Sequence, residues 1–269
     1  MSLRHAPWEE AGEFRIGLAP IAPEAWLEGG EADPSARKDP LFAAHPAEVW
    51  AETEGSRPAQ AEVLELVAAA LGRSIAEDGR PPLLAAARAV ADDLCLMEKR
   101  DGAWRLTALS LSAGSFFTAS EVIGRSLAEL HVPVTGFQER LLTRVTRIFD
   151  GLRDGLVLER RNWSVVSSPD LFMPDPAPMR AVIPDIDPAD AAEALRVRVE
   201  RQTLRRLPRT GGVLFTIRVW IDPLSAIAAD PDRLARFAAA WRTAHPDFRA
   251  YKKLHLYDAL VAEVIGAAG

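Results

Sequence analysis

The segment 195–220 constrains the fold of this chain more than any other. Its first residues alternate apolar and charged side chains with a period of two, which is typical of a half-buried strand. A proline and two glycines then interrupt the pattern, as turn residues do. Residues 213–220 follow with mainly β-branched and aromatic side chains. The segment therefore predicts a long β-hairpin at or near the centre of a sheet.

This hairpin is strongly basic. It contains seven arginines and one acid, Glu200, in a chain whose net charge is −6. Two explanations stay open. The arginines can form a solvated outer face whose aliphatic stems cover apolar surface. Alternatively, they can bind an anionic ligand such as a carboxylate, a phosphate or a propionate.

Composition limits the class of protein. A length of 269 residues fits one large domain or two small ones, and 48% hydrophobic with 26% charged residues is ordinary for a globular chain. Cys95 is the single cysteine, so no disulfide can form within the chain, and we expect a cytoplasmic protein. No apolar run approaches the roughly 18 residues of a membrane helix, and the acidic balance argues against a nucleic-acid partner.

Three further strands are expected. Two apolar runs are joined by Asp101-Gly102, which is a strong hairpin signal. Together with a later strand and the basic hairpin they predict an α+β fold, with helices around a mainly antiparallel sheet of about five strands. The predicted strands are 92–98, 103–111, 156–167, 195–207 and 212–220.

Helices are predicted around this sheet. Apolar side chains at helical spacing indicate helices over 59–72 and 137–150, another from Pro82, and two towards the C-terminus. Ser120 is the expected N-cap of a helix that leads to His131. Residues 168–186 are rich in proline and predict a loop that could cover a site.

The whole chain, 1–269, is expected to form a single domain. Residues 1–58 contain many prolines and little periodicity, so we expect them to pack over the body of the fold. Residues 59–224 would form the core and residues 225–269 the C-terminal helices. The expected anchors of the N-terminal segment are the large aromatic side chains Trp8, Trp26 and Trp50.

Few residues are candidates for chemistry. Zinc-protease, nucleophile-elbow, phosphate-loop and dinucleotide motifs are absent, as are obvious flavin or iron–sulfur motifs. The five histidines lack the spacing of a multi-histidine metal site. His131 stands out because Val-Pro-Val follows it and favours an extended chain. It could be a structural or capping residue, an axial ligand or a proton-transfer group. Asp92 and Asp93 could be paired carboxylates or part of a strand-entry turn, and Cys95 is expected in the core.

Several phrases occur together along the chain: ADDLCLMEKRDGAWRLTA, LAELHVPV, RRNWSVV and RVERQTLRRLPRTGGVLFTIRVW. From about Arg37 to about Leu224 the chain resembles the family of the haem-dependent oxidative N-demethylase α subunit. The resemblance implies a PAS-like antiparallel sheet and a b-type haem. It also implies oxidation of a small amine, dimethylamine, to a smaller amine and formaldehyde, with electrons from separate flavin and iron–sulfur partner subunits.

The resemblance bears on single residues as well. The pattern Leu-x-x-x-His-x-Pro-Val puts His131 where the family shows its histidine, which we hypothesise to be the iron ligand. The Glu-Arg-Gln-Thr-Leu-Arg-Arg block contains Arg201 and Arg205, which could pair with haem propionates. It also contains Glu200, whose carboxylate could bind a protonated amine.

Two more candidates come from the second strand of the basic hairpin. Arg218 is a catalytic candidate beside Glu200, and Phe215 would wall the haem slot. The segment 112–117 departs from the Pro-Ser-x-Trp phrase that relatives more often carry, so the ligand here could differ.

Three functions stay open at this point. The chain could be a haem-dependent oxidative enzyme acting on a small amine, with an external electron donor. It could be a PAS-like haem or small-molecule sensor or carrier without turnover. It could also be a scaffold that has lost haem or binds another ligand.

Overall fold

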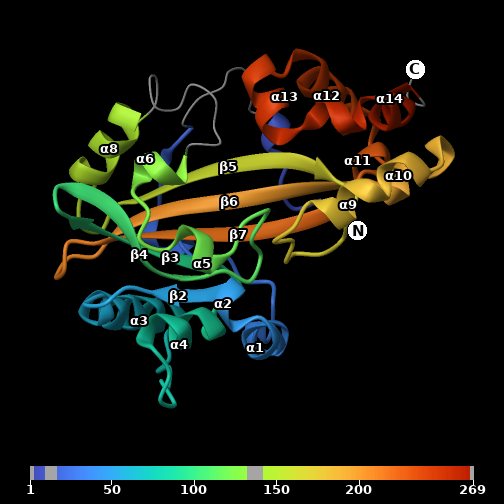
Figure 1. The fold of residues 1–269 in the computed structure, drawn as a ribbon. Helices are drawn as coiled ribbons and strands as arrows, with labels where there is room; N and C mark the ends of the chain where they lie inside the picture. Colours follow the sequence, from blue (N-terminus) through green and yellow to red (C-terminus); the bar gives the residue numbers. More distant parts are fainter. Residues whose placement is uncertain (1–2, 10–16, 132–141, 267–269) are drawn as a thin grey trace.

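All the named strands join in one antiparallel sheet. The computed structural model describes residues 3–9, 17–131 and 142–266. In this part of the chain the sheet has seven strands in the order β1-β5-β6-β7-β3-β4-β2 (Figure 1). They are β1 (Ala19–Ile21), β2 (Trp50–Glu52), β3 (Asp93–Arg100), β4 (Ala103–Ser110), β5 (Val157–Val166), β6 (Arg196–Arg206) and β7 (Val213–Pro223).

The five predicted strands are confirmed in a single sheet, but the predicted number was wrong. The strands β1 and β2 lie at the two edges and come from the N-terminal segment, for which no strand was predicted. Each has only three residues, which is too short for a period of two to be recognised in the sequence. The N-terminal segment therefore contributes to the sheet as well as covering it.

The long hairpin is the centre of the sheet, as predicted. Strand β6 pairs with β7 from Arg196↔Pro223 to Arg206↔Val213, and with β5 along its other side. The β3–β4 hairpin turns at Asp101 and Gly102, with φ values of 52° and 78°. Both values lie in the left-handed region that a two-residue hairpin turn requires, which explains the Asp-Gly signal.

Helices cover both faces of the sheet (Figure 1). None of the helices in the described part of the chain is long and apolar enough to cross a membrane. The α-helices are α1 (Pro34–Ala44), α2 (Pro46–Val49), α3 (Arg57–Leu71), α4 (Pro82–Ala89), α5 (Ala119–Val122), α6 (Leu127–Leu130), α8 (Leu142–Gly151), α9 (Ala177–Ala181), α10 (Ala191–Ala194), α11 (Ser225–Ala228), α12 (Pro231–Thr243), α13 (Pro246–Lys252) and α14 (Asp258–Gly266). Short 3-10 helices are η1 (Pro7–Glu9), η2 (Pro23–Ala25), η3 (Ile183–Asp185), η4 (Pro188–Asp190) and η5 (Leu254–Tyr257).

Three helix predictions need correction or restriction. The N-cap of α5 is Thr118, whose backbone N–H donates to Glu121 at 2.7 Å, and Ser120 lies inside the helix. The proline-rich segment 168–186 is not wholly loop, because it contains α9 and η3. The helix predicted over 137–150 corresponds to α8, but residues 137–141 lie outside the described residues.

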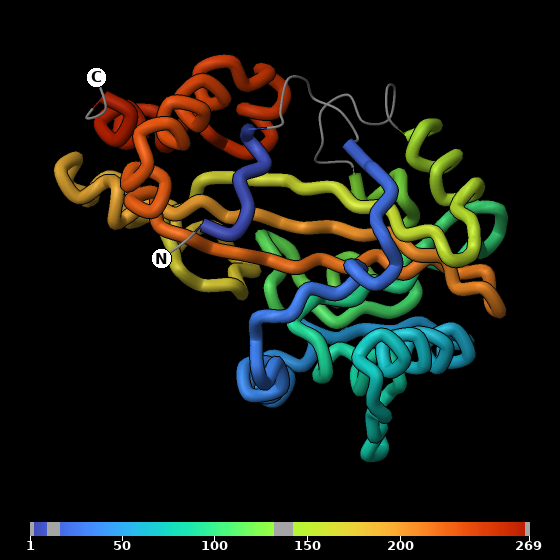
Figure 2. The backbone as a smooth tube through the Cα atoms, turned by 180° about the vertical axis from the view of Figure 1, so that it is seen from behind, coloured from blue at the N-terminus to red at the C-terminus, as the bar shows by residue number. Residues whose placement is uncertain are grey.

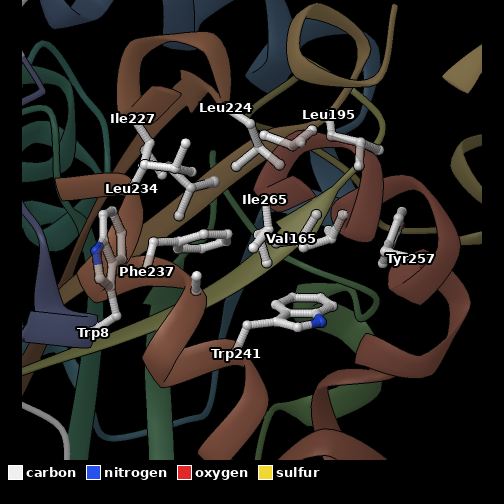
Figure 3. Close-up of a cluster of buried hydrophobic side chains, with 14 of the residues drawn as sticks. Trp8, Val165, Leu195, Leu224, Ile227, Leu234, Phe237, Trp241, Tyr257 and Ile265 are labelled. Atoms are coloured by element: carbon white, nitrogen blue, oxygen red, sulfur yellow. The ribbon is translucent and has the colours of Figure 1, made fainter. Parts of the chain in front are cut away.

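Two apolar clusters fill the sheet face that α3, α4 and the C-terminal helices cover. One lies beneath α3 and α4 and includes Trp26, which is completely buried. The other joins α12 and α14 to β5 and β6, with Trp8, Phe237 and Trp241 among its members (Figure 3). Trp8 contacts Phe237 edge to face at 5.4 Å. Of the three predicted anchors of the N-terminal segment, Trp8 and Trp26 are buried, and Trp50 is only partly buried against the cluster beneath α3 and α4.

A third cluster lies on the opposite face. It packs α5, α6 and α8 against apolar side chains of β3 and β4, with Phe149 of α8, Met97 of β3 and Leu106 of β4 among its members. Side chains alternate along each strand, so neighbouring residues such as Leu96 and Met97 serve different faces. The face of the sheet that carries this third cluster also carries the cavity.

Candidate functional site

A cavity of about 870 Å³ lies between the sheet and the segments that cover this face. Its floor includes Cys95 and Met97 of β3, Leu204 of β6, and Phe215 and Ile217 of β7. Residues from α5, α6, α8, α9 and α13 close the other sides. A largely apolar cavity of this size is typical of a site for a cofactor or another small ligand.

His131 lines this cavity at the end of α6. Ser126 begins the helix, accepting from the Glu129 N–H and donating to the Glu129 carboxylate, so four residues suffice to form it. The Nδ1 of His131 lies 2.8 Å from the carbonyl oxygen of Leu127. Because a carbonyl only accepts, Nδ1 carries the hydrogen, and the lone pair of the neutral ring is on Nε2.

The neutral form of His131 is the favoured one. Burial lowers the pKa of His131, the hydrogen bond to Leu127 opposes that change, and the charge of Arg160 adds to the lowering. A neutral imidazole whose Nδ1–H is held by a carbonyl is the usual state of a histidine that ligates a metal. This geometry can supply one axial ligand.

Strand alternation sets the polar part of the cavity. Alternate residues in the middle of β6 line the cavity, namely the polar Arg198, Glu200 and Gln202 and the apolar Leu204. The facing residues of β5 are Arg160, Asn162 and Ser164. The pairing of Gln202 with Arg160, and of Glu200 with Asn162, explains why these polar side chains share one face.

Glu200 is an ionised carboxylate within this polar part. Burial alone would raise the pKa of Glu200, but the charges of Lys252, Arg198 and Arg160 lower it below its usual value. Its Oε2 accepts from the side-chain amide of Gln202 at 3.0 Å. Such a carboxylate can orient a cationic group of a ligand.

Arg198 is almost fully enclosed, with 1% of its surface exposed. Its guanidinium donates to the carbonyl oxygens of Leu171, at 3.3 Å, and of Ala113. Ala113 is held in turn by Asp93, whose Oδ2 accepts from the Ala113 N–H at 2.9 Å. Asp93 also accepts from the backbone N–H and the hydroxyl of Ser112. Asp93 therefore fixes the loop that positions Arg198.

Asp92, the neighbour of Asp93, points to the other face. It lies among Lys38 and Arg218, and neither of its carboxylate oxygens has a hydrogen-bond partner among the described residues. Asp92 and Asp93 thus face opposite sides of the sheet and do not form a carboxylate pair. Cys95 is buried, as expected, and burial raises the pKa of its thiol.

All three predicted site arginines lie on the opposite face of the sheet, which the N-terminal segment crosses (Figure 2). Arg201 donates to Glu159 at 2.6 Å and to the carbonyl oxygens of Trp26 and Ala25. The guanidinium of Arg205 stacks on the Trp26 ring at 4.4 Å from its centroid. That of Arg218 stacks on Trp220 at 4.3 Å and reaches Glu31 at 3.4 Å. The structure therefore brings His131, Glu200 and Phe215 to one cavity, and does not bring these arginines there.

Several cavity residues were missed from the sequence. Arg198 shares the face of Glu200 two residues away, and the period of two in β6 could have distinguished it from Arg201. Arg160, Tyr251 and Lys252 had no comparable signal, because β5 and α13 meet β6 only through tertiary structure.

No group of three or more histidine, cysteine, aspartate or glutamate side chains in the described segments has the arrangement of a metal site. A metal held only by protein ligands would need such a group. A single histidine is sufficient when a macrocycle supplies the remaining ligands, as in haem proteins. The apolar floor, the ionised Glu200 and the buried cations also suit an organic ligand that carries charged groups.

A protein-family model matches most of this chain. The family model described as "Haem-dependent oxidative N-demethylase, alpha subunit-like" matches residues 71–262, which include β3 to β7 and helices from both sheet faces. The match therefore includes His131, Glu200 and Lys252 and most of the cavity lining. The chain belongs to the haem-dependent oxidative N-demethylase α-subunit-like family.

Proposed function

We propose that this protein binds haem b in the cavity and acts as the haem-carrying subunit of an oxidative N-demethylase of small amines. The observation that carries the proposal is His131, which lines an apolar cavity with its Nδ1–H held by the Leu127 carbonyl. His131 would be the axial ligand of the iron through Nε2. We also propose that the five-stranded core, β3 to β7, is PAS-like.

The residues present fit a haem in three respects. The cavity volume of about 870 Å³ falls within the usual range for cofactor sites. Its floor is apolar, and Phe215 offers an aromatic side chain to a flat macrocycle. Arg180 on α9 lines the cavity, and its buried Nε has no hydrogen-bond partner among the described residues. Arg180 and the exposed Arg125 are the cations that we propose for the propionates.

The protein's own groups would hold the amine and the cofactor. Glu200 would orient the ammonium group of the substrate, since the surrounding cations keep this carboxylate ionised. Haem, when bound, would supply the activation of dioxygen. In the overall reaction the N-methyl amine, dioxygen, two electrons and two protons yield the demethylated amine, formaldehyde and water. We propose that separate flavin and iron–sulfur subunits deliver the electrons, which accords with the family description of an α subunit. A cytoplasmic location would suit such an assembly.

The visible spectrum of the protein reconstituted with haemin tests this proposal. We expect a Soret band for the wild type, and for His131→Ala a haem affinity lower by about tenfold or more. Added imidazole should restore the spectrum of that variant by replacing the missing ring. His255→Ala is the matched control, because His255 is exposed and does not line the cavity.

A turnover assay completes the test. Reconstituted protein with dimethylamine, dioxygen and a reductase that supplies electrons should release formaldehyde. A wild type without a Soret band would refute haem binding. A Soret band without formaldehyde would instead indicate a haem sensor or carrier.

A further inference from the structure

Three cationic side chains meet at the polar part of the cavity, and we call them the inner cationic cluster. They are Arg160 of β5, Arg198 of β6 and Lys252 of α13, and all three line the cavity. Their charges act together on Glu200, which lies between their strands and helix. Burial lowers the pKa of Lys252, and the charges of Arg160 and Arg198 lower it further, against the effect of Glu200.

The hydrogen-bonding capacity of the inner cationic cluster is not used up. The Nε atoms of Arg160 and Arg198 are buried and have no hydrogen-bond partner among the described residues. The nearest carboxylate oxygen to Arg198 Nε is Oε1 of Glu200 at 3.7 Å, which is longer than a hydrogen bond. Buried donors without acceptors are uncommon in proteins, and an anionic acceptor satisfies them best.

Charge also favours an anion. All three cations act on the single carboxylate of Glu200, and only Arg198 among them also interacts with Asp93, so positive charge is in excess. The Asp93 oxygens already accept three hydrogen bonds from Ser112 and Ala113. Arg198 is buried and Arg160 and Lys252 are partly buried, so water screens this excess charge only in part and an anionic ligand in the cavity would offset it. A simple alkylammonium ion would add to that excess.

We propose that the inner cationic cluster is a carboxylate subsite, so that the substrate is a secondary or tertiary amine that also carries a carboxylate, the class of N-methylated amino acids. The proposal rests on the proposed function, which supplies the reaction at the N-methyl group. Glu200 then binds the ammonium group of the zwitterion, while Arg160, Arg198 and Lys252 bind its carboxylate. The ammonium and the carboxylate of the ligand are then each paired with a protein group of opposite charge. Because the ligand is a zwitterion, its binding adds no net charge to the cavity.

Ligand titrations test this subsite. N-methylglycine is the probe, and dimethylamine is the comparator that lacks the carboxylate. Affinity is measured from the change in Soret absorbance of the haem-loaded protein and by calorimetry with haem-free protein. We expect N-methylglycine to bind at least about tenfold more tightly than dimethylamine, because of the charge-assisted hydrogen bonds to its carboxylate.

Variants assign the effect to the inner cationic cluster. Arg160→Gln and Lys252→Gln should each weaken binding of N-methylglycine by about tenfold and should not weaken binding of dimethylamine. Because the two substitutions are made in separate proteins, the test still works if one of the two variants does not fold. Arg161→Gln is the matched control. Arg161 is the neighbour of Arg160 on β5, pairs with Glu159 at 2.7 Å and does not line the cavity. Arg161→Gln should leave both affinities unchanged.

Haem propionates are the other carboxylates that could use these cations. If Arg160→Gln and Lys252→Gln lower the affinity for haemin and leave that for N-methylglycine unchanged, the carboxylate subsite for substrate is refuted while haem binding stands. Equal or tighter binding of dimethylamine by the wild type refutes it as well. If the wild type takes up no haemin, the proposed function fails, and calorimetry on the haem-free protein still decides whether the subsite binds carboxylates.

Discussion

Arg201 is buried on the sheet face opposite to the cavity, and its partners are internal. It donates to Glu159 and to the carbonyl oxygens of Ala25 and Trp26. We expect Arg201→Met to lower the free energy of unfolding by about 2–3 kcal/mol, because two carbonyl oxygens lose their donor and Glu159 loses the more deeply buried of its two arginine partners, Arg201 and Arg161. Urea denaturation measures this. Arg205→Met, which removes only the stacking on Trp26, should cost about 1 kcal/mol; equal losses would contradict the structural role of Arg201.

Glu28 makes stability depend on acid pH. It contacts His5 and Trp220, each at 3.1 Å, and Arg201 at 3.7 Å. Burial would raise the pKa of Glu28, but these partners lower it to about 2 from 4.5. The folded state therefore binds this proton less readily than the unfolded state does, so the stabilisation is present above pH 4.5 and is lost as the pH falls towards about 2.

We expect Glu28→Gln to flatten that acid-dependent loss and to lower the free energy of unfolding at neutral pH by about 1–2 kcal/mol. Chemical denaturation at a series of pH values between 2 and 7 measures both effects. Glu24→Gln is the control, because Glu24 is an exposed neighbour on η2. A variant at Glu28 with the same pH profile as the wild type would show that the carboxylate contributes nothing to it.

The sequence could identify the residue types of the site but not their faces. Glu200, Arg201 and Arg205 were grouped because they are close in sequence, although side chains of adjacent strand residues point to opposite faces. Glu200 faces the cavity, and both arginines face the N-terminal segment. The partners of Glu200 come from β5 and α13, whose position beside β6 depends on the whole fold.

At the scale of elements, helix α3 depends on the residue that ends it. Gly72 has a φ of +65°, a left-handed backbone conformation that strains any residue with a side chain. Space is not the obstacle, because no atom lies within 4 Å of an added Cβ. We expect Gly72→Ala to cost about 1 kcal/mol of stability. Gly151 at the end of α8 also has open space, but its φ is not positive, so Gly151→Ala should stabilise by about 0.5–1 kcal/mol. Thermal unfolding of both variants checks the opposite signs; a loss in both would contradict the backbone explanation.

Helices and strands long enough to repeat their apolar pattern several times were predicted well, and the shortest helices and strands were not. Strands β3 to β7 and helix α3 each repeat their apolar spacing often enough to be recognised. Strands β1 and β2 have three residues each, and helices α5 and α6 four. These short elements form because the sheet edge and the capping side chains supply their hydrogen bonds, which leaves little pattern in the sequence.

At the scale of the whole molecule, the segment 168–186 joins two strands that are already paired. Strands β5 and β6 pair from Val157↔Arg205 to Val166↔Arg196. We expect limited proteolysis within 168–186 to leave two fragments that elute together in size-exclusion chromatography and separate only in denaturant. Fragments that separate under native conditions would show that the halves do not form one folded unit.

The order of the strands has a consequence for how fast the protein can fold. Strand β3 pairs with β7 across about 120 residues of chain, whereas β3–β4, β5–β6 and β6–β7 pair neighbours in the sequence of strands. Among the pairings of the described strands, β1–β5 closes a longer loop but adds only a three-residue edge strand. We therefore expect closure of the β3–β7 seam to limit the rate at which the body of the sheet forms. The cavity floor spans that seam, with Cys95 and Met97 on one side and Phe215 and Ile217 on the other. On the ribosome, therefore, the floor of the cavity is incomplete until β7 has been synthesised and has paired with β3.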